Sequence, residues 1–447
     1  MSPNHRRVAV TGIGPVTAAG IGVDGLRAGL RSARSPVATV TRFDTAPFRS
    51  HMAAEIRDFD PTDFVDAKTA RRTDRFVQFA LAASVLALRD AGLTRRGGAG
   101  ESGVGGSRGA GGIGEQTSAG HGDPNVLDPA RTAVWLGSAM GGIAHAETQL
   151  RAFLERGARG LDPRLATTTF PGAASCQVAI HLGITGPNST NAMSCAAGTM
   201  AVGEGARLVR EGLVDVALTG GAEAPLAPVC YGAFAALRAM SQRNDAPHES
   251  CRPFDDERDG FVMGEGACVL VLEERSRALA RGARIYAEVV GFGTNNDAFH
   301  MAAPRPDGAM SALAIGAALR DAGIAASDVD HVNAHASSTP LNDRTESLAL
   351  RLALGKHTDN VSVTGTKPFH GHALGASGAI EAAITCLTLA DGWVPPTLNL
   401  STAGVGCDLA YVTGSGQRGA VDVALCTSFG FGGINAVLAL ASAGARP

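Results

Sequence analysis

Two segments of this 447-residue chain each occur twice, in the same order, and this internal repeat constrains the fold more than any single element. The heptapeptide Ala87–Leu93 recurs with one conservative change as Ala318–Ile324, and Val214–Leu218 recurs unchanged as Val421–Leu425. Chance repetition is the alternative, but the shared order favours two related halves. The two segments lie farther apart in the first half than in the second. Gly97–Gly122, a glycine-rich stretch without apolar periodicity, accounts for this difference as a flexible surface insertion.

Short β-type runs alternate with longer helical stretches, which is typical of an α/β architecture with buried strands. The predicted strands include Val8–Val10, Val134–Gly137, Val214–Leu218, Val269–Leu272, Val329–Asn333 and Val421–Thr427. The predicted helices include Asp74–Ala91, Cys195–Glu211, Met310–Ala322, Asn342–Leu354 and Gly375–Ala390. We expect an N-terminal half at residues 1–275 and a C-terminal half at residues 276–447.

Composition excludes several classes of protein. Charged residues are 18% of the chain and the net charge is −3, so there is no broad basic field for nucleic acid or a membrane surface. No apolar run is long enough to predict a membrane span. The eight cysteines form no C-x-x-C pair, which argues against a zinc site or a disulfide framework. They indicate reduced thiols in a cytoplasmic protein.

Cys195 lies among small residues, directly before a predicted helix. At such a strand-to-helix turn the backbone N–H groups and the helix dipole favour negative charge, so we expect a lowered thiol pKa. The neighbouring N–H can also stabilise an oxyanion. Taken alone, this segment is better explained by a buried core thiol at Cys195, like Cys268 or Cys386.

Two histidines change this interpretation. His335 ends a predicted strand, and His372 lies in a loop that leads into the helix near Gly375. Both have small and hydroxyl neighbours, in places where active sites are usually built. Lys367 and Glu346 lie near them in sequence, and we expect a lysine–glutamate pair to keep the imidazoles neutral.

The segment Ser428–Asn435 alternates glycine and phenylalanine after the last buried strand, which permits a tight loop with two hinged aromatic rings. No helix is expected after it, and Gly12–Gly14 lacks the third glycine of a dinucleotide fingerprint. Neither segment therefore indicates a nucleotide cofactor.

Together these motifs resemble the β-ketoacyl-[acyl carrier protein] synthases, the elongating ketosynthases of fatty acid and type II polyketide synthesis. The matching segments extend from Val8–Gly14 through Cys251–Asp255 and Arg258–Ala267 to the terminal Gly-Phe loop. The order Cys, His, Lys, His followed by GFGG is highly specific. The resemblance implies a thiolase-like α/β fold, with two βαβαβαββ halves in a five-layered αβαβα arrangement, in agreement with the repeat.

The resemblance also implies a role for each reacting residue in a decarboxylative Claisen condensation. Cys195 is the expected nucleophile that receives the acyl chain from a carrier-protein thioester. His335 and His372 are the expected pair that promotes decarboxylation of the malonyl extender and stabilises the enolate. Lys367 and Glu346 resemble the supporting ion pair.

Other residues match positions that bind rather than react. Ser337 and Thr339 are similar to the hydroxyls that hold the phosphopantetheine arm of an acyl carrier protein. Phe431 resembles the gating phenylalanine, and the amides of Cys195 and Phe431 would form the oxyanion hole.

The resemblance implies partners as well. Arg71 and Arg72 look like part of a basic patch that docks the acyl carrier protein. The family usually forms a homodimer, and a heterodimer with a chain-length factor is the alternative assembly. Because neutral imidazoles can donate hydrogen bonds without a metal, no metal or redox cofactor is expected.

The sequence departs from fatty-acid elongation enzymes at a few positions. They are Ala336 in place of glycine, Pro368, Phe369 and His370 after the lysine, and Ile434 in place of threonine. We expect these changes to alter the substrate class more than the reaction type, and His370 to be a bystander.

Three other functions remain open. A non-catalytic chain-length partner typically lacks the cysteine, which is present here. A CoA-dependent thiolase or starter-condensing enzyme uses Cys-His-Cys or Cys-His-Asn sets, whereas His372 occupies the matching place. In a Cys-His hydrolase or acyltransferase the second histidine would be surplus.

Overall fold

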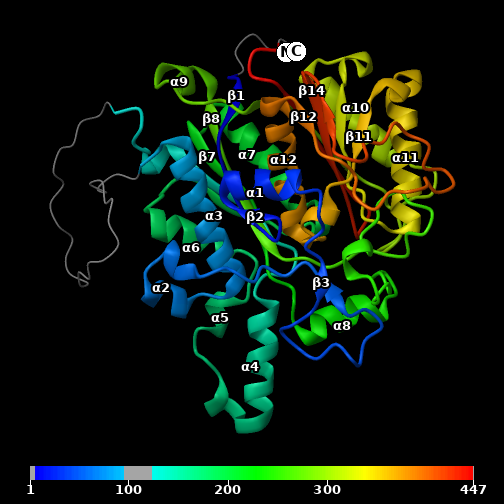
Figure 1. Cartoon of the computed structure of the whole chain (residues 1–447). Helices are drawn as coiled ribbons and strands as arrows, with labels where there is room; N and C mark the ends of the chain where they lie inside the picture. The colour runs from blue at the N-terminus through cyan, green and yellow to red at the C-terminus, as the bar shows by residue number, and fades with distance from the viewer. Residues whose placement is uncertain (1–5, 95–122, 446–447) are drawn as a thin grey trace.

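The two copies of each repeated segment adopt the same structure in the computed structural model, which describes residues 6–94 and 123–445 (Figure 1). The first repeat closes α3 (Arg75–Ala91) and, in its second copy, α10 (Ala309–Ala322). Each helix ends at a glycine in the left-handed conformation, Gly92 with φ 65° and Gly323 with φ 70°. Their N–H groups bond to carbonyls of the last turn, which caps the helix. The predicted insertion at Gly97–Gly122 lies outside the described residues.

The second repeat leads into equivalent strands of one sheet. Eleven strands of the described residues form it, in the order β6-β5-β7-β8-β1-β9-β15-β14-β10-β11, with β2 paired to β1. The strands are β1 (Val8–Thr17), β2 (Gly20–Ile21), β5 (Thr132–Gly137), β6 (Asn188–Asn191), β7 (Val216–Glu223), β8 (Gly266–Glu274), β9 (Ala287–Asn296), β10 (His331–Asn333), β11 (Ser362–Thr364), β14 (Val423–Gly430) and β15 (Ile434–Ala441). Two small sheets pair β3 (Ala38–Thr39) with β4 (Met52–Ala53) and β12 (Trp393–Val394) with β13 (Gln417–Arg418).

The sheet order is symmetric about its centre. β5 pairs in parallel with β6 and β7, as β10 does with β11 and β14, and β7–β8 and β14–β15 are antiparallel. The halves join where β1 meets β9 at two residue pairs, Ala9 with Glu288 and Val10 with Ala287. This confirms the two related halves predicted from the repeat. The boundary between residues 275 and 276 stays a prediction.

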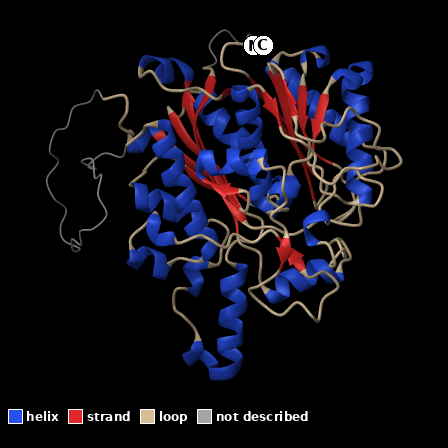
Figure 2. Ribbon diagram, in the orientation of Figure 1, coloured by secondary structure: helices blue, strands red, loops and turns tan. Residues whose placement is uncertain are grey.

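Helices pack on both faces of the sheet, and two of them lie between its two groups of strands. Figure 2 shows two groups of strands with helices between and outside them. α7 and α12 lie between the groups and contact strands of both, while α3 packs outside one group and α10 outside the other. The resulting αβαβα order agrees with the predicted five layers. The other helices are α1 (Gly22–Arg31), α2 (Ala67–Arg72), α4 (Ile143–Arg156), α5 (Leu165–Thr168), α6 (Ala173–Leu182), α7 (Ala197–Arg210), α8 (Pro228–Ala236), α9 (Arg275–Ala280), α11 (Pro340–Leu354) and α12 (Ser377–Asp391).

Glycines in the two joining strands let the outer helices approach closely. A Cβ added at Gly12 of β1 would lie 2.3 Å from the carbonyl oxygen of Ala87, and one at Gly291 of β9 would lie 2.2 Å from that of Ala318. Ala87 and Ala318 begin the two copies of the repeated heptapeptide. The glycines near the amino terminus therefore serve helix packing.

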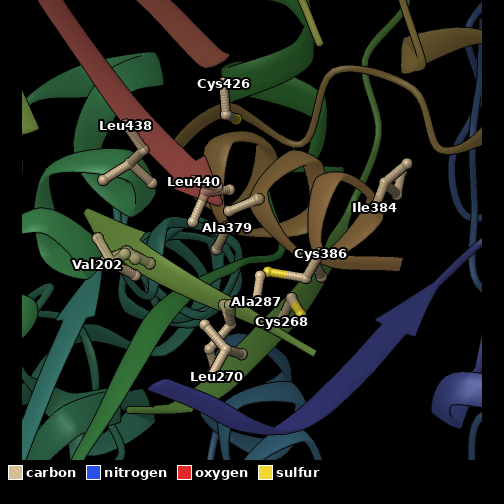
Figure 3. Packing of buried hydrophobic residues seen from close by; sticks show 14 of the residues in the cluster. Val202, Cys268, Leu270, Ala287, Ala379, Ile384, Cys386, Cys426, Leu438 and Leu440 are labelled. Atoms are coloured by element: carbon tan, nitrogen blue, oxygen red, sulfur yellow. The ribbon is translucent and has the colours of Figure 1, made fainter. Parts of the chain in front are cut away.

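The central helix α12 is buried on nearly every side and is mainly apolar. Val202, Ala379, Ile384 and Leu438 pack together between the two groups of strands (Figure 3). The stretch Leu374–Asp391 has the length and mean hydropathy (1.2) of a membrane-crossing helix, but 89% of it is buried inside the protein. Because a helix between two sheets meets protein on every side, its apolar composition is explained by its place in the core.

Candidate active site

Cys195 lies at the tight turn that the sequence predicts. β6 is followed by a short 3-10 helix, Ser194–Ala196, which continues directly into α7. Ser194 has a φ of 49°, an uncommon value for a residue with a side chain, and Cys195 is 7% exposed. Strained backbone of this kind costs roughly 1–3 kcal/mol and clusters at functional sites. The turn presents the thiol to a cavity.

The expectation of a lowered pKa for Cys195 is wrong. Burial raises the pKa of the thiol above its ordinary value, and this effect exceeds the opposing hydrogen bonds and the charge of Lys367. Loss of solvation penalises the thiolate more than the surrounding dipoles favour it. The thiol therefore needs a base to become a nucleophile.

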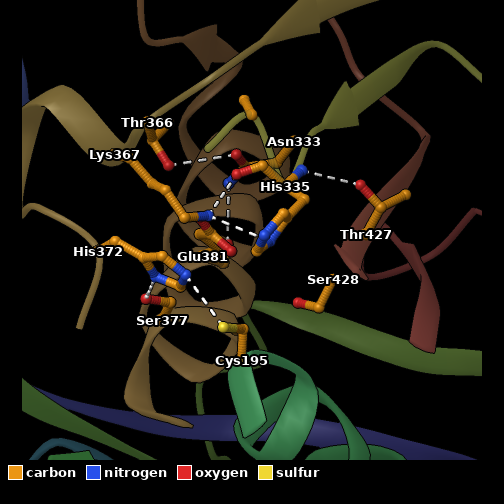
Figure 4. Close-up of polar contacts among 12 residues, drawn as sticks. Cys195, Asn333, His335, Thr366, Lys367, His372, Ser377, Glu381, Thr427 and Ser428 are labelled. Atoms are coloured by element: carbon orange, nitrogen blue, oxygen red, sulfur yellow. Dashed lines mark hydrogen bonds and ion pairs between the residues drawn. The ribbon is translucent and has the colours of Figure 1, made fainter. Parts of the chain in front are cut away.

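His372 lies in the right place to act as that base. Its Nε2 lies 3.1 Å from the Sγ of Cys195, and its Nδ1 lies 2.8 Å from the Oγ of Ser377 at the start of α12 (Figure 4). Burial, followed by the charge of Lys367, holds the pKa of His372 well below its usual value. The Ser377 hydroxyl can accept from Nδ1–H or donate to a bare Nδ1, so the imidazole can exchange a proton at Nε2 without losing this bond.

His335 lies beside His372, directly after β10. The two imidazole centroids are 5.4 Å apart and the rings are nearly perpendicular. The His335 backbone N–H donates to Glu346 Oε1 at 2.8 Å and the next N–H, of Ala336, donates to Oε2 at 2.8 Å. Glu346 thus fixes the turn that presents His335. Burial, then the charge of Lys367, holds the pKa of His335 well below its usual value.

The predicted ion pair of Lys367 with Glu346 is wrong in its partner. Lys367 Nζ bonds to Glu381 Oε1 at 2.5 Å, and both side chains are 0% exposed. Glu381 lies on α12, which passes directly beneath the lysine in Figure 4. The carboxylate of Glu346 is instead occupied by backbone N–H groups and by the hydroxyl of Thr427.

Lys367 also fixes the tautomer of His335. Its Nζ donates to the His335 carbonyl oxygen and lies 3.4 Å from the His335 Nδ1. Because an ammonium group only donates, Nδ1 is the acceptor in this contact and the ring proton is assigned to Nε2. His335 is therefore arranged to donate from Nε2 into the site.

A cavity of about 440 Å³ connects these groups to the surface. Cys195, His335 and His372 line it, and so do the predicted arm-binding residues Ser337 and Thr339. The two hydroxyls lie 2.9 Å apart, and Thr339 also caps α11 by accepting from the N–H of its third residue. The site therefore combines a buried reactive end with a largely apolar cavity whose wall carries two hydroxyl groups.

The Gly-Phe loop closes the other side of the sulfur. The Phe431 backbone N–H donates toward the Sγ of Cys195. Its half-buried ring stacks on Phe234 of α8 with centroids 6.2 Å apart, and the Gly432 N–H donates to the carbonyl of Met301 at 2.7 Å. The predicted gating ring thus lies in the wall of the cavity.

The residues that depart from fatty-acid elongation enzymes differ in their structural surroundings. Ala336 adopts φ 42°, in the left-handed region that glycine enters without strain. Pro368, Phe369 and His370 are all buried, and neither ring nitrogen of His370 has a hydrogen-bond partner. Burial lowers the pKa of His370 to about 3. The sulfur contacts His372 rather than this ring.

Arg71 and Arg72 lie apart from the reactive groups. They end α2, and both are exposed. The carbonyl oxygen of Arg71 accepts a hydrogen bond from the guanidinium group of Arg164, which links the end of α2 to the segment just before α5.

Sequence reasoning missed four polar residues of the site. They are Ser377, Glu381, Thr427 and Glu223. Glu381 had a usable signal, because a lone carboxylate in a buried apolar helix is almost always paired. Within residues 6–94 and 123–445, no group of three or more His, Cys, Asp or Glu side chains is arranged to hold a metal ion.

Comparison with family models and curated proteins gives a consistent result. The chain matches the β-ketoacyl synthase N-terminal domain over residues 5–121 and 115–278, and the C-terminal domain over residues 286–401. A relative from Synechocystis sp., named 3-oxoacyl-[acyl-carrier-protein] synthase 2, is 42% identical over 434 residues, or 97% of each chain. A relative of that name from Staphylococcus aureus is 39% identical over 438 residues, or 98% of each chain.

Solved structures agree over the same length. The ishigamide ketosynthase/chain length factor and a β-ketoacyl synthase from Burkholderia phymatum each have a TM-score of 0.85 and 33% identity. Both alignments cover 98% of this chain and 100% of the other. A type II polyketide synthase acyl-carrier protein in complex with its ketosynthase bound to the hexaketide has a TM-score of 0.83 and 31% identity, with the same coverage.

Proposed function

The chain belongs to the β-ketoacyl synthase family, and on that premise we propose that it elongates an acyl chain held on Cys195 by decarboxylative condensation with malonyl-[acyl carrier protein]. One observation carries the proposal. The Sγ of Cys195 lies 3.1 Å from the Nε2 of His372, while His335 directs its own Nε2–H into the same cavity. A hydrolase or a thiolase does not need the second imidazole donor.

The first half-reaction is acyl transfer. His372 Nε2 takes the thiol proton as Sγ attacks the acyl thioester, and the carrier thiolate that leaves takes the proton back. The oxyanion formed at the thioester carbon is held by the N–H groups of Cys195 and Phe431, the second of which already points at the sulfur. The products are acyl-Cys195 and the free carrier thiol.

The second half-reaction forms the carbon–carbon bond. The malonyl thioester loses CO₂, and the electron pair of the broken bond becomes an enolate whose oxygen accepts from the Nε2–H of His335. The Nε2–H of His372 donates to the same oxygen once the single proton of its neutral ring has moved from Nδ1 to Nε2, with the Ser377 hydroxyl then donating to the bare Nδ1. The enolate carbon attacks the acyl-Cys195 carbonyl, and the tetrahedral intermediate collapses with release of the cysteine thiolate. A proton from solvent then restores the Cys195 thiol, which balances the proton that left with the carrier thiol in the first half-reaction. Neutral rings suit this step, and burial of both histidines keeps them neutral.

Delivery of both substrates by an acyl carrier protein is part of the proposal. Ser337 and Thr339 would bind the phosphopantetheine arm along the cavity, and Arg71 and Arg72 would meet acidic residues of the carrier protein. The solved complex of a ketosynthase with its acyl-carrier protein supports this partner class.

The open edge of β6 supports a dimer. β6 pairs only with β5 among the described strands, which leaves its outer backbone groups free. Ile180 on the adjoining α6 and Met193 just beyond β6 are 73% and 48% exposed. An unpaired edge flanked by apolar side chains is suited to pairing with a second chain. We propose a homodimer, with a heterodimer containing a chain-length factor as the second assembly, because related solved structures include such pairs.

The proposal includes no metal or redox cofactor, because two imidazole donors and two backbone donors supply the stabilisation that the reaction needs. Condensation is then expected to be unaffected by a chelator. A reducing, cytoplasmic location is also proposed, and it is supported by the eight cysteines, which are all free thiols.

The test follows both half-reactions. Purified chain is incubated with acyl-loaded and malonyl-loaded carrier proteins, and CO₂ release and the intact protein mass are recorded. We expect an acyl adduct on Cys195 and a condensed product, and neither with Cys195→Ala. A Cys195→Ala variant that still condenses would refute the nucleophile assignment.

A further inference from the structure

Glu223, the last residue of β7, is a fully buried carboxylate that the mechanism above does not use. Its Oε2 accepts from the N–H of Ala139 at 2.7 Å and of Gly375 at 3.1 Å. Its Oε1 accepts from the N–H of Met140 at 3.0 Å and from the hydroxyl of Ser138 at 3.3 Å. One side chain therefore joins two segments that are far apart in the sequence.

Both segments belong to the walls of the active site. Gly375 lies between His372 and Ser377, the hydroxyl that bonds to the His372 ring. The same glycine contacts the helix behind the nucleophile, since a Cβ added at Gly198 of α7 would lie 2.7 Å from the Gly375 carbonyl oxygen. The bond from Glu223 thus holds the segment of the base against the helix of the nucleophile.

The two halves of the molecule use a carboxylate in the same way. β5 and β10 occupy equivalent places in the sheet order. After β10, Glu346 accepts from two successive N–H groups and so presents His335. After β5, Glu223 accepts from the successive N–H groups of Ala139 and Met140, and in addition reaches Gly375. The N-terminal half therefore has a counterpart of the group that orients a catalytic histidine.

We propose that Glu223 is the positioning residue for His372, holding its segment so that Nε2 stays within proton-transfer distance of the Cys195 sulfur. This inference rests on the proposed condensation. Within the described residues Glu223 forms no ion pair, so its charge is stabilised only by N–H and O–H donors. Burial raises the pKa of Glu223 to about 7, which agrees with a carboxylate that lacks a cationic partner.

Glu223→Gln tests the inference, because an amide cannot accept from both sets of donors at once. We expect its kcat for condensation to fall by about tenfold or more, with a KM for malonyl-[acyl carrier protein] within about twofold of wild type. We also expect slower alkylation of Cys195 by iodoacetamide, by about fivefold, followed by peptide mass. Glu273→Gln is the matched control. Glu273 is equally buried but is bound by Arg277 and Arg281 away from the site.

An unchanged kcat and alkylation rate in Glu223→Gln would overturn the inference, and so would an equal loss in Glu273→Gln. If the Gln variant does not fold, Glu223→Asp decides instead, since it keeps the charge but shortens the reach. A Glu223→Asp variant with the kcat and the Cys195 alkylation rate of the wild type would overturn the inference. A folded Glu223→Asp variant in which both rates are lower would support it. A wild-type chain that does not condense refutes the proposed function alone, because alkylation of Cys195 needs no acyl substrate.

Discussion

At the scale of single residues, burial decides the chemistry of the site. It raises the pKa of Cys195 and holds the pKa of both His335 and His372 low. Lys367, which is equally buried, forms an ion pair with Glu381. Uncharged imidazoles can then donate to a developing enolate, and the nearby ammonium group of Lys367 is fixed by Glu381 and the His335 backbone. The reactivity of the thiol consequently depends on its contact with His372.

Removing the ionic partner of a buried charge strongly lowers the stability of the folded protein. Glu381→Gln leaves Lys367 buried without a counter-ion, and we expect a loss of about 3–5 kcal/mol in the free energy of unfolding. Urea denaturation at pH 8 measures it, above the pKa of about 7 to which burial raises Glu381. Glu257→Gln is the control, since Glu257 is 67% exposed and pairs with Arg243. A loss as small as the control's, below about 1 kcal/mol, would contradict the assigned pair.

Replacing His370 is expected to increase the stability of the protein. His370→Phe removes two buried ring nitrogens without partners, and we expect it to keep condensing and to raise stability by about 1–3 kcal/mol at pH 8. Burial lowers the pKa of His370 to about 3 in the folded protein, below the value of about 6.5 in the unfolded chain. Below about pH 6.5 the unfolded chain therefore binds a proton that the folded protein does not, and the wild type loses up to about 1.4 kcal/mol of stability per pH unit.

The stability advantage of His370→Phe is therefore expected to grow between pH 8 and pH 5. Urea unfolding at the two pH values measures this difference. An advantage that does not change with pH, or a variant that no longer condenses, would show that His370 is not a neutral bystander.

At the scale of elements, close contact between two central helices sets the geometry of the site. α7 follows Cys195, and α12 follows the His372 segment. Gly198 faces Gly375 and Ala379, where an added Cβ would lie 2.7 Å from the carbonyl oxygen and 2.9 Å from the N–H nitrogen. Neither backbone atom can move without moving its helix.

Gly198→Ala is expected to separate these helices. We expect a loss of about 1–3 kcal/mol in stability from overpacking, together with a lower kcat, because Cys195 moves away from His372. Gly316→Ala on α10 is the control. Its added Cβ meets only the flexible end of Arg320, and we expect stability to rise by up to about 1 kcal/mol. Similar behaviour of the two variants would argue against the contact as a constraint on the site.

At the scale of the whole molecule, the pseudo-symmetric sheet brings the reacting groups together from both halves. The nucleophile comes from the N-terminal half and both histidines from the C-terminal half. They meet because α7 and α12 lie side by side between the strand groups. The outer end of the N-terminal strand group is β6, whose free edge is the proposed dimer contact.

Thr190→Pro tests this contact. The Val134 N–H bonds to Pro187 and the Ser138 N–H to Asn191, so the alternate residue Thr190 directs its backbone N–H away from β5. Proline removes that donor. We expect the wild-type chain at twice its 45.4 kDa mass in light scattering, and the variant at the monomer mass with its helical circular dichroism retained. A wild-type monomer that pairs only with a chain-length factor would favour the heterodimer.

The internal repeat and the alternation of strands and helices were sufficient to predict two related α/β halves. The five-layer order and the meeting of Cys195, His335 and His372 in one cavity followed from the resemblance to the ketosynthases. Repeats, periodicity and motif order are properties of neighbouring residues along the chain, so they survive without a structure. The partner of Lys367, the raised pKa of Cys195 and the contacts of Glu223 were decided only by the tertiary structure. A buried charge selects the group that packing brings closest, and desolvation depends on everything that surrounds the atom. Neither quantity is encoded in sequence spacing.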